Sequence, residues 1–233
     1  MSRTLLGQPA GLSQPGANLQ TVTKSAHGRN YATGYLDEDD RLTQVSKGVY
    51  ASGAVLENEF TVNYSYDSMG RMLRRSSGSE VTSFVWDGWD LLSETTDSVE
   101  TTYLVPDGLV WSFLRGEEVF QVHTDALGSV RVVTDSEGDV VARFEYGAWG
   151  ELLPGSFDDV GLALRFVGGL GVRTDLETGL YYMRHRWYDA ELQRFISRDP
   201  IGLSGGSNQY VYCVNKPQRF VDPDGKRICL SGP

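Results

Sequence analysis

The chain has 233 residues, which is long enough for one large domain or two small ones with a sizeable buried core. The chain has 21 Lys and Arg residues and 31 Asp and Glu residues, and the resulting formal charge of −10 argues against a protein that binds the phosphates of a nucleic acid. No apolar run approaches the ~20 residues that cross a bilayer, and the first residues lack the apolar centre of a signal peptide. We therefore expect a soluble chain with no membrane span, no nucleic-acid partner and no cleavable leader.

Metal and cofactor chemistry is not indicated. Cys213 and Cys229 stand sixteen residues apart with no second pair, so neither a disulfide framework nor a zinc site is expected. The three histidines, His27, His123 and His185, show no metal-ligand spacing. The sequence predicts no metal and no cofactor.

The rest of the composition favours an all-β protein. There are 27 glycines but only 8 prolines, and aromatic residues make up 11% of the chain. Glycine supplies turns with positive φ, while aromatic residues fill pleated faces, so this mixture is typical of many short antiparallel strands.

In chain order, residues 1–28 are small, polar and rich in turn formers, and they predict a loose lead-in. Alternation with period two follows. Residues 61–66 place Val62, Tyr64 and Tyr66 on one face of a strand, and residues 140–146 alternate in the same way.

The turns between these strands repeat. Asp67, Asp87, Asp107 and Asp125 are separated by 20, 20 and 18 residues, and residues 35–42 look like an earlier, worn copy. A period near 20 that holds a strand, a turn and another strand indicates a stacked β-array, because one hairpin cannot bury its own face.

Two stretches carry a family resemblance. Residues 64–71, with Tyr-x-Tyr-Asp-x-x-Gly-Arg, resemble the YD repeat of the rearrangement-hotspot (RHS) family. Residues 161–225 are similar to the RHS-associated core, with the motifs Gly179-Leu180-Tyr181-Tyr182-x-Arg184-x-Arg186-Trp187-Tyr188-Asp189, Arg194-Phe195-Ile196-Ser197-x-Asp199-Pro200-Ile201-Gly202-Leu203 and Asp222-Pro223-x-Gly225.

The resemblance implies a fold and a domain plan. YD repeats over residues 29–160 would form part of a β-shell, an RHS core over residues 161–225 would curl inward as its plug, and residues 226–233 would be a short tail. Relatives enclose a C-terminal toxic polypeptide, so the implied partners are the rest of a larger shell or its payload. The implied route is export through a specialised secretion system.

The resemblance also implies a chemistry. In related polymorphic toxins the plug resembles an aspartyl protease that cuts its own chain just after the second Asp-Pro-x-Gly motif. Carried over by position, the essential arginine is Arg186 and the two aspartates are Asp199 and Asp222. The cut would then fall between Lys226 and Arg227, and any enzyme activity would be self-cleavage in cis.

The same residues can be argued from chemistry. Peptide hydrolysis by carboxyl groups needs one carboxylate to take a proton from water and one protonated acid, and two aspartates that share a proton separate into these roles. A neighbouring arginine would stabilise the developing oxyanion. Alternatively, Asp-Pro-x-Gly is an ordinary turn sequence, and Arg186 could share one strand face with Arg184 and stack on aromatic residues.

The sequence departs from the family pattern in three respects. Lys226 stands where the family has leucine, and Gln193 stands where it has glycine, so a turn with positive φ there would be strained. Only seven residues follow Lys226, and the repeats are too few to close a shell. These features predict either the C-terminal part of a larger RHS protein or a decayed gene.

Two functions remain open at this point. The first is the self-processing plug. The second is a structural or adhesive β-repeat module without turnover, in which tryptophans line a binding surface. In either case an open stack of few repeats exposes its first strand edge, which predicts a homo-oligomer formed through that edge, disorder of the N-terminal third or poor solubility.

Overall fold

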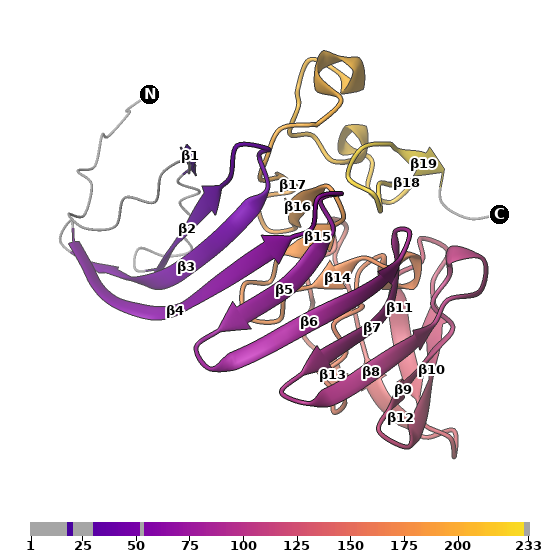
Figure 1. Ribbon diagram of the computed structural model, residues 1–233. Helices are drawn as coiled ribbons and strands as arrows, with labels where there is room; N and C mark the ends of the chain where they lie inside the picture. The colour runs from indigo at the N-terminus through magenta and orange to yellow at the C-terminus, as the bar shows by residue number, and fades with distance from the viewer. Residues whose placement is uncertain (1–17, 21–29, 52–53, 231–233) are drawn as a thin grey trace.

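The computed structural model of the chain describes residues 18–20, 30–51 and 54–230, and most of its strands join one large antiparallel sheet (Figure 1). Thirteen strands follow one another in chain order, each paired with the next. They are β1 (Asn18–Gln20), β2 (Asn30–Leu36), β3 (Leu42–Ala51), β4 (Ala54–Tyr66), β5 (Met72–Ser77), β6 (Glu80–Asp87), β7 (Asp90–Thr96), β8 (Val99–Leu104), β9 (Ser112–Arg115), β10 (Glu118–Thr124), β11 (Val130–Thr134), β12 (Val140–Arg143) and β13 (Phe157–Asp158).

The lead-in expected for residues 1–28 lies outside the described residues, apart from Asn18–Gln20, which pairs with β2. The sheet does not close on itself, because β1 and β13 each have one partner. The strand predicted over residues 61–66 is the end of β4, with Val62 and Tyr64 buried and Asn63 exposed. The alternation predicted for residues 140–146 ends as a strand at Arg143.

One type of turn recurs along the sheet. At Asp67 the backbone N–H donates to the Arg71 carbonyl over 2.9 Å, and Gly70 N–H donates back to the Asp67 carbonyl over 3.0 Å. The Asp67 carboxylate accepts hydrogen bonds from two further amides of the turn. The same pattern begins at Asp37, Asp125 and Asp135, so the worn first copy is a genuine repeat unit.

The same turn occurs at Gly147, whose N–H donates to the Glu151 carbonyl over 2.9 Å, with glycine in the place of the aspartate. A Cβ at Gly147 would lie 2.0 Å from Oε1 of Glu151, and that carboxylate accepts the Trp149 N–H over 3.0 Å. The Glu151 side chain folds back into the space of the missing aspartate and bonds the same turn.

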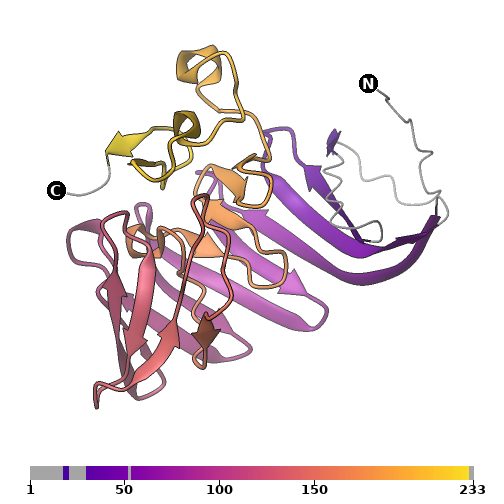
Figure 2. The same ribbon diagram turned by 180° about the vertical axis from the view of Figure 1, so that it is seen from behind.

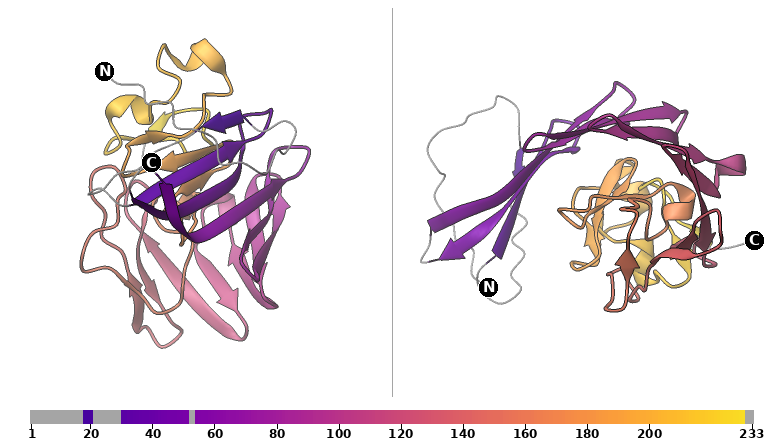
Figure 3. Two further views of the ribbon diagram at one scale, coloured as in Figure 1. Left: turned by 90° about the vertical axis from the view of Figure 1, so that its left-hand side faces the viewer. Right: turned by 90° about the horizontal axis from the view of Figure 1, so that it is seen from below.

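Residues 161–230 are here called the C-terminal segment. Seen from below, the sheet forms an arc around the segment (Figure 3). Seen from behind, its orange first part lies in front of the indigo and magenta strands, whereas its yellow last part stands above the end of the sheet (Figure 2). It contains a four-stranded and a two-stranded sheet. These strands are β14 (Arg173–Thr174), β15 (Tyr181–Met183), β16 (Arg186–Asp189), β17 (Arg194–Phe195), β18 (Phe220–Val221) and β19 (Cys229–Leu230).

Four short 3₁₀ turns, η1 (Pro106–Gly108), η2 (Gly168–Leu170), η3 (Gly202–Gly205) and η4 (Cys213–Asn215), complete the described structure. In the described parts of the chain, no helix is long and apolar enough to reach across a bilayer. The predicted fold class is confirmed: an all-β partial shell of antiparallel repeats with an inward-curling C-terminal segment.

A shared hydrophobic core holds the segment against the sheet. Tyr182 and Trp187 belong to the same buried cluster as the inward side chains of β2 to β12. The Trp187 ring lies 4.6 Å from the Tyr64 ring between centroids, and its Nε1–H donates to the Tyr66 hydroxyl over 2.9 Å. Burying one large aromatic side chain contributes about 1.5–3 kcal/mol, so this contact is a main source of the docking energy.

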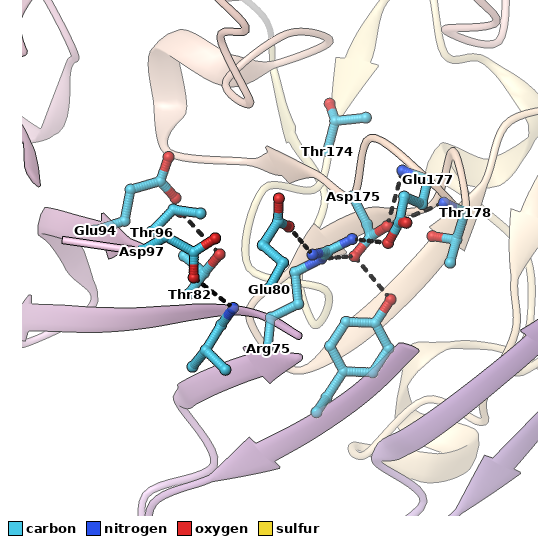
Figure 4. A network of polar contacts seen from close by, with 12 residues as sticks. Arg75, Glu80, Thr82, Glu94, Thr96, Asp97, Thr174, Asp175, Glu177 and Thr178 are labelled. Carbon is cyan, nitrogen blue, oxygen red and sulfur yellow. Dashed lines mark hydrogen bonds and ion pairs between the residues drawn. The ribbon is translucent and has the colours of Figure 1, made fainter. Parts of the chain in front are cut away.

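Buried ion pairs reinforce the docking (Figure 4). Arg75 of β5 donates from Nε to Oδ2 of Asp175 over 2.7 Å, and the Tyr64 hydroxyl donates to the same oxygen over 3.0 Å. The guanidinium also binds Glu80 and Glu177. Burial would raise the pKa of Asp175, but the hydrogen bond and charge of Arg75 hold that pKa below its ordinary value.

In a second buried ion pair the charges are reversed: the arginine lies in the C-terminal segment and the carboxylate lies in the sheet. Arg173 of β14 donates from Nε to Oε2 of Glu94 in β7 over 2.7 Å, and the Tyr103 hydroxyl donates to Glu94 Oε1 over 2.9 Å. The sheet thus supplies one cation and one anion, and the C-terminal segment supplies their partners. Because a buried charge without its partner is energetically costly, the two ion pairs fix the position of the C-terminal segment on the sheet.

Candidate functional site

The second Asp-Pro-x-Gly turn, residues 222–225, is held by the β15–β16 hairpin. Three consecutive hairpin residues each donate to one of three consecutive turn carbonyls. Arg184 Nη1 donates to Pro223 O over 2.8 Å, His185 N–H and Nδ1 donate to Asp224 O over 3.2 and 2.9 Å, and Arg186 Nε donates to Gly225 O. The turn therefore has little freedom to move relative to the hairpin.

Gly225 is required at its position for two reasons. Its φ of +69° lies in the left-handed region, which other residues adopt at a cost. A Cβ there would also lie 2.6 Å from the Met183 carbonyl oxygen and 3.0 Å from the Arg186 nitrogen. The hairpin can approach this closely only because the turn contains glycine.

The structure brings the three predicted catalytic residues together. Nη2 of Arg186 lies 3.1 Å from Oδ2 of Asp199 and 3.1 Å from Oδ2 of Asp222. Both carboxylates therefore contact the same nitrogen atom. Arg186 is buried, its guanidinium stacks 3.5 Å from the centre of the Phe195 ring, and its Nη1 donates to Gln209 O over 3.2 Å.

The two Asp-Pro-x-Gly turns present their carboxylates in a similar way. Gly202 and Gly225 have φ values of +63° and +69°, and each donates its N–H to the carbonyl of the motif's aspartate. Oδ1 of Asp199 accepts the Ile201 N–H over 3.0 Å. The Asp222 side chain is 3% exposed, whereas the Asp199 side chain is 11% exposed. Asp199 is thus the more accessible of the two carboxylates to water.

The buried carboxyl has an unusual affinity for protons. Burial raises the pKa of Asp222 to about 7, and a hydrogen bond with the Asp224 carboxyl acts in the same direction. The Arg186 charge opposes this rise only in part. The same bond with Asp222, together with backbone amides, holds the pKa of Asp224 below its ordinary value. The site therefore contains one carboxyl group whose pKa lies close to neutral pH.

The predicted cleavage point adjoins these carboxyls. Oδ1 of Asp222 accepts the N–H groups of Lys226 and Arg227, each over 3.0 Å. Beyond the bond, Cys229 pairs with Val221 in the β18–β19 ladder. The nitrogen of the Lys226–Arg227 peptide bond is thus in direct contact with the proposed acid.

Sequence reasoning missed part of this site. Arg184 does not share a strand face with Arg186, because Arg184 has a φ of +53° and lies in the turn between β15 and β16. Asp224 appears only as the variable position of the motif, although a second acid two residues after Asp222 is visible in the sequence. Gln193 has a φ of +60°, so the expected positive-φ turn is present without its glycine.

Neither cofactor nor metal ligation is suggested by the site. Among residues 18–20, 30–51 and 54–230, no cluster of three His, Cys, Asp or Glu side chains is arranged to hold a metal ion. The three carboxyls around Arg186 are instead balanced by that guanidinium and by backbone amides.

Comparison with known proteins places the chain in a family. The Teneurin YD-shell family matches residues 29–212, so the chain belongs to this family of RHS and YD-repeat proteins. It is 30% identical, over 91% of its length, to the double-stranded DNA deaminase toxin A of Burkholderia cenocepacia. It is 32% identical, over 83% of its length, to the tRNA3(Ser)-specific nuclease WapA of Bacillus spizizenii. The chain spans only 16% and 8% of these two proteins.

Solved structures share the fold. The TcdB2–TccC3–Cdc42 crystal structure aligns with 84% of this chain and 10% of its own, with a TM-score of 0.64 and 20% identity. The Photorhabdus luminescens Tc holotoxin pore aligns with 87% of this chain and 10% of its own, with a TM-score of 0.66 and 18% identity. The chain therefore has the fold of a small part of much larger toxin shells.

Proposed function

We propose that this chain is the plugged end of a toxin-enclosing shell and that it cuts its own backbone between Lys226 and Arg227. The observation that carries the proposal is the contact of Arg186 Nη2 with both Asp199 and Asp222 at 3.1 Å. A guanidinium between two carboxyls, one enclosed and one reachable by water, supplies the asymmetry that hydrolysis by an aspartate pair needs.

The roles follow from the surroundings. Asp199, with partial access to solvent, takes a proton from a water molecule whose oxygen bonds to the Lys226 carbonyl carbon. Asp222, protonated, gives its proton to the Arg227 nitrogen as the carbon–nitrogen bond breaks. The products are a new carboxyl group at Lys226 and a free peptide of residues 227–233. Arg186 keeps the two carboxyls in place and stabilises charge that develops nearby.

The proposed partners are the remainder of a larger shell and its payload. One relative is a toxin by name and another is a tRNA nuclease, and the chain matches only a small share of each. A partial shell with β1 and β13 as unshared edges fits a piece of a longer wall. Export through a specialised system, as the name of the toxin relative suggests, belongs to the same proposal.

The intact mass of freshly expressed protein tests the cleavage. We expect the parent chain to lose residues 227–233 and the Asp199→Asn variant to keep them. Asp135→Asn is the matched control, because Asp135 caps an ordinary repeat turn through the same kind of side-chain bonds, far from Arg186 in sequence. A parent chain that is folded and uncut would contradict the proposal.

A non-catalytic adhesive module is the second candidate. The observation in its favour is Trp111, whose side chain on the sheet is 60% exposed. Trp187 is buried, and the remaining three tryptophans are half-buried. A glycan-array screen tests this function, and saturable binding that is lost in Trp111→Ala would support it.

A further inference from the structure

Two carboxyls, not one, bind the amides around the proposed cut. The N–H of Lys226 lies 3.0 Å from Oδ1 of Asp222 and 2.9 Å from Oδ1 of Asp224. The N–H of Arg227 lies 3.0 Å from each of the same two oxygens. Two oxygen atoms that share both donors must themselves be close neighbours.

This arrangement favours a shared proton. Two amide donors cannot satisfy two full negative charges, and like charges this close cannot both ionise cheaply. A single proton between the two carboxyls removes the repulsion and leaves both oxygens able to accept the amides. Asp222 is buried, so the neutral form of its carboxyl is favoured.

The backbone prevents the pair from separating. The carbonyls of residues 223, 224 and 225 are each held by one hairpin residue, and Gly225 lies against the Met183 carbonyl. The carboxyls therefore cannot move apart by a rotation of the turn. Arg186 is the permanent cation in hydrogen-bond contact with the pair. The other charged and titratable groups near the pair are Arg184, His185, Asp199, Lys226, Tyr212 and Cys213.

We propose that Asp224 is a catalytic residue of the self-cleavage: it shares one proton with Asp222, and the pair delivers this proton to the Arg227 nitrogen. The inference rests on the proposed function. In the step, Asp199 takes one proton from water as the water oxygen bonds to the Lys226 carbonyl carbon, the bond to the Arg227 nitrogen breaks, and that nitrogen receives the shared proton. The pair is left with two negative charges, which Arg186, the Lys226 amide and the new amino group of Arg227 stabilise until the peptide departs.

The pH behaviour of the two groups agrees with this geometry. The pKa of Asp222 is raised to about 7 by burial and by the bond to Asp224, while the pKa of Asp224 is lowered. Such a pair titrates as a unit. The rate of cleavage should therefore fall as the pH rises through the upper apparent pKa of the pair.

The full-length chain is isolated under denaturing conditions, before it can fold and cut itself. Refolding it from urea then starts the reaction at a defined time, and intact mass follows the rate. We expect Asp224→Asn to slow release of residues 227–233 about 100-fold, as the loss of a general acid typically does. Its remaining activity should decline at a lower pH than that of the parent, because Asp222 has lost the partner that raises its pKa. Asp135→Asn should retain the parent rate and profile.

A second measurement detects the shared proton in the Asp199→Asn background, which we expect to stay uncut. With ¹³C-labelled aspartate side chains, one carboxyl of this variant should stay protonated until near pH 7, and that titration should move to lower pH when Asp224→Asn is added. If the double variant does not recover a native spectrum, the titration of Asp199→Asn alone decides the question. An Asp199→Asn chain in which no aspartate titrates near neutral pH would overturn the shared proton.

The outcomes separate the two proposals. A parent that is cut while Asp224→Asn is cut at the same rate and with the same pH profile overturns the role of Asp224 alone. A folded parent that is never cut overturns the proposed function, and with it any catalytic role of the pair, whatever the titration shows.

Discussion

Arg75 in the fifth strand of the sheet and Asp175 in the C-terminal segment form a buried ion pair, with Nε and Oδ2 2.7 Å apart and the Asp175 side chain fully enclosed. One hundred residues separate the two in the sequence. Because the acidic turns at Asp199 and Asp222 belong to the segment that this pair docks, the position of the candidate site depends on charges far from it.

Removing the charge of Asp175 should therefore destabilise the whole chain. Asp175→Asn keeps an oxygen for the amides of residues 177 and 178 but leaves Arg75 without its enclosed partner. We expect a loss of about 3 kcal/mol in the free energy of unfolding, measured with urea. Glu145→Gln, which breaks a more exposed pair with Arg131, should cost less than about 1 kcal/mol. Equal effects of the two changes would refute a special role for the buried pair.

The Arg75–Asp175 ion pair also predicts how the stability of the chain depends on pH. Since Arg75 holds the folded pKa of Asp175 below its ordinary value, the pair contributes fully above the unfolded pKa of about 4. That contribution is lost as the pH falls through the lower, folded pKa. The stability gap between the parent and Asp175→Asn should thus be constant from pH 7 to 5 and shrink below pH 4. A gap that does not change down to pH 3 would be inconsistent with the ion pair.

Asp222 should give the stability of the chain a pH dependence opposite to that of Asp175. Its folded pKa of about 7 means that the folded chain holds a proton between about pH 4 and 7 that the unfolded chain has released. Stability therefore falls with rising pH, by up to about 1.4 kcal/mol per pH unit for this proton. In the Asp199→Asn background, which we expect to stay uncut, adding Asp222→Asn should remove this slope. Urea unfolding at pH 4.5 and 6.5 measures it, and identical slopes would contradict the raised pKa.

Glycine at position 225 can be compared with glycine at position 202. Both residues have left-handed φ values, but a Cβ at Gly202 meets nothing within 4 Å, whereas one at Gly225 meets the Met183 carbonyl at 2.6 Å. Gly202→Ala should cost about 1 kcal/mol from backbone strain alone. Gly225→Ala should cost a further ~2 kcal/mol from overpacking and should abolish any cleavage. Similar thermal stabilities of the two variants would show that close packing of the β15–β16 hairpin against Gly225 does not contribute to stability.

The turns and strands could be predicted because each is determined by residues that are close together in the sequence. Turns such as the one at Asp67 are specified by an aspartate and a glycine three residues later, and the strands follow from alternation between them. The convergence of Arg186, Asp199 and Asp222 came from a family resemblance, and the structure places all three in contact.

The docking contacts could not be predicted in this way. Arg75 and Glu94 sit in strands where a charged residue usually faces solvent, and their partners Asp175 and Arg173 lie about 80–100 residues away. Asp224 was hidden for a different reason. Its role depends on the fold of the turn, which brings its carboxyl to the same two amides as Asp222.

The homo-oligomer expected from an open strand edge stays a prediction. The edge strands β1 and β13 have three and two residues, and such short edges offer few unpaired groups to a second copy. Sedimentation equilibrium over a hundredfold range of concentration measures the association, and a monomer throughout would contradict the expectation.

Self-cleavage in cis is tested most directly by refolding the chain in H₂¹⁸O at two concentrations tenfold apart and following its mass. The account predicts loss of residues 227–233 with the same first-order rate at both concentrations, and one ¹⁸O atom in the new carboxyl group of Lys226. A chain that regains its native spectrum and keeps its full mass would contradict the account.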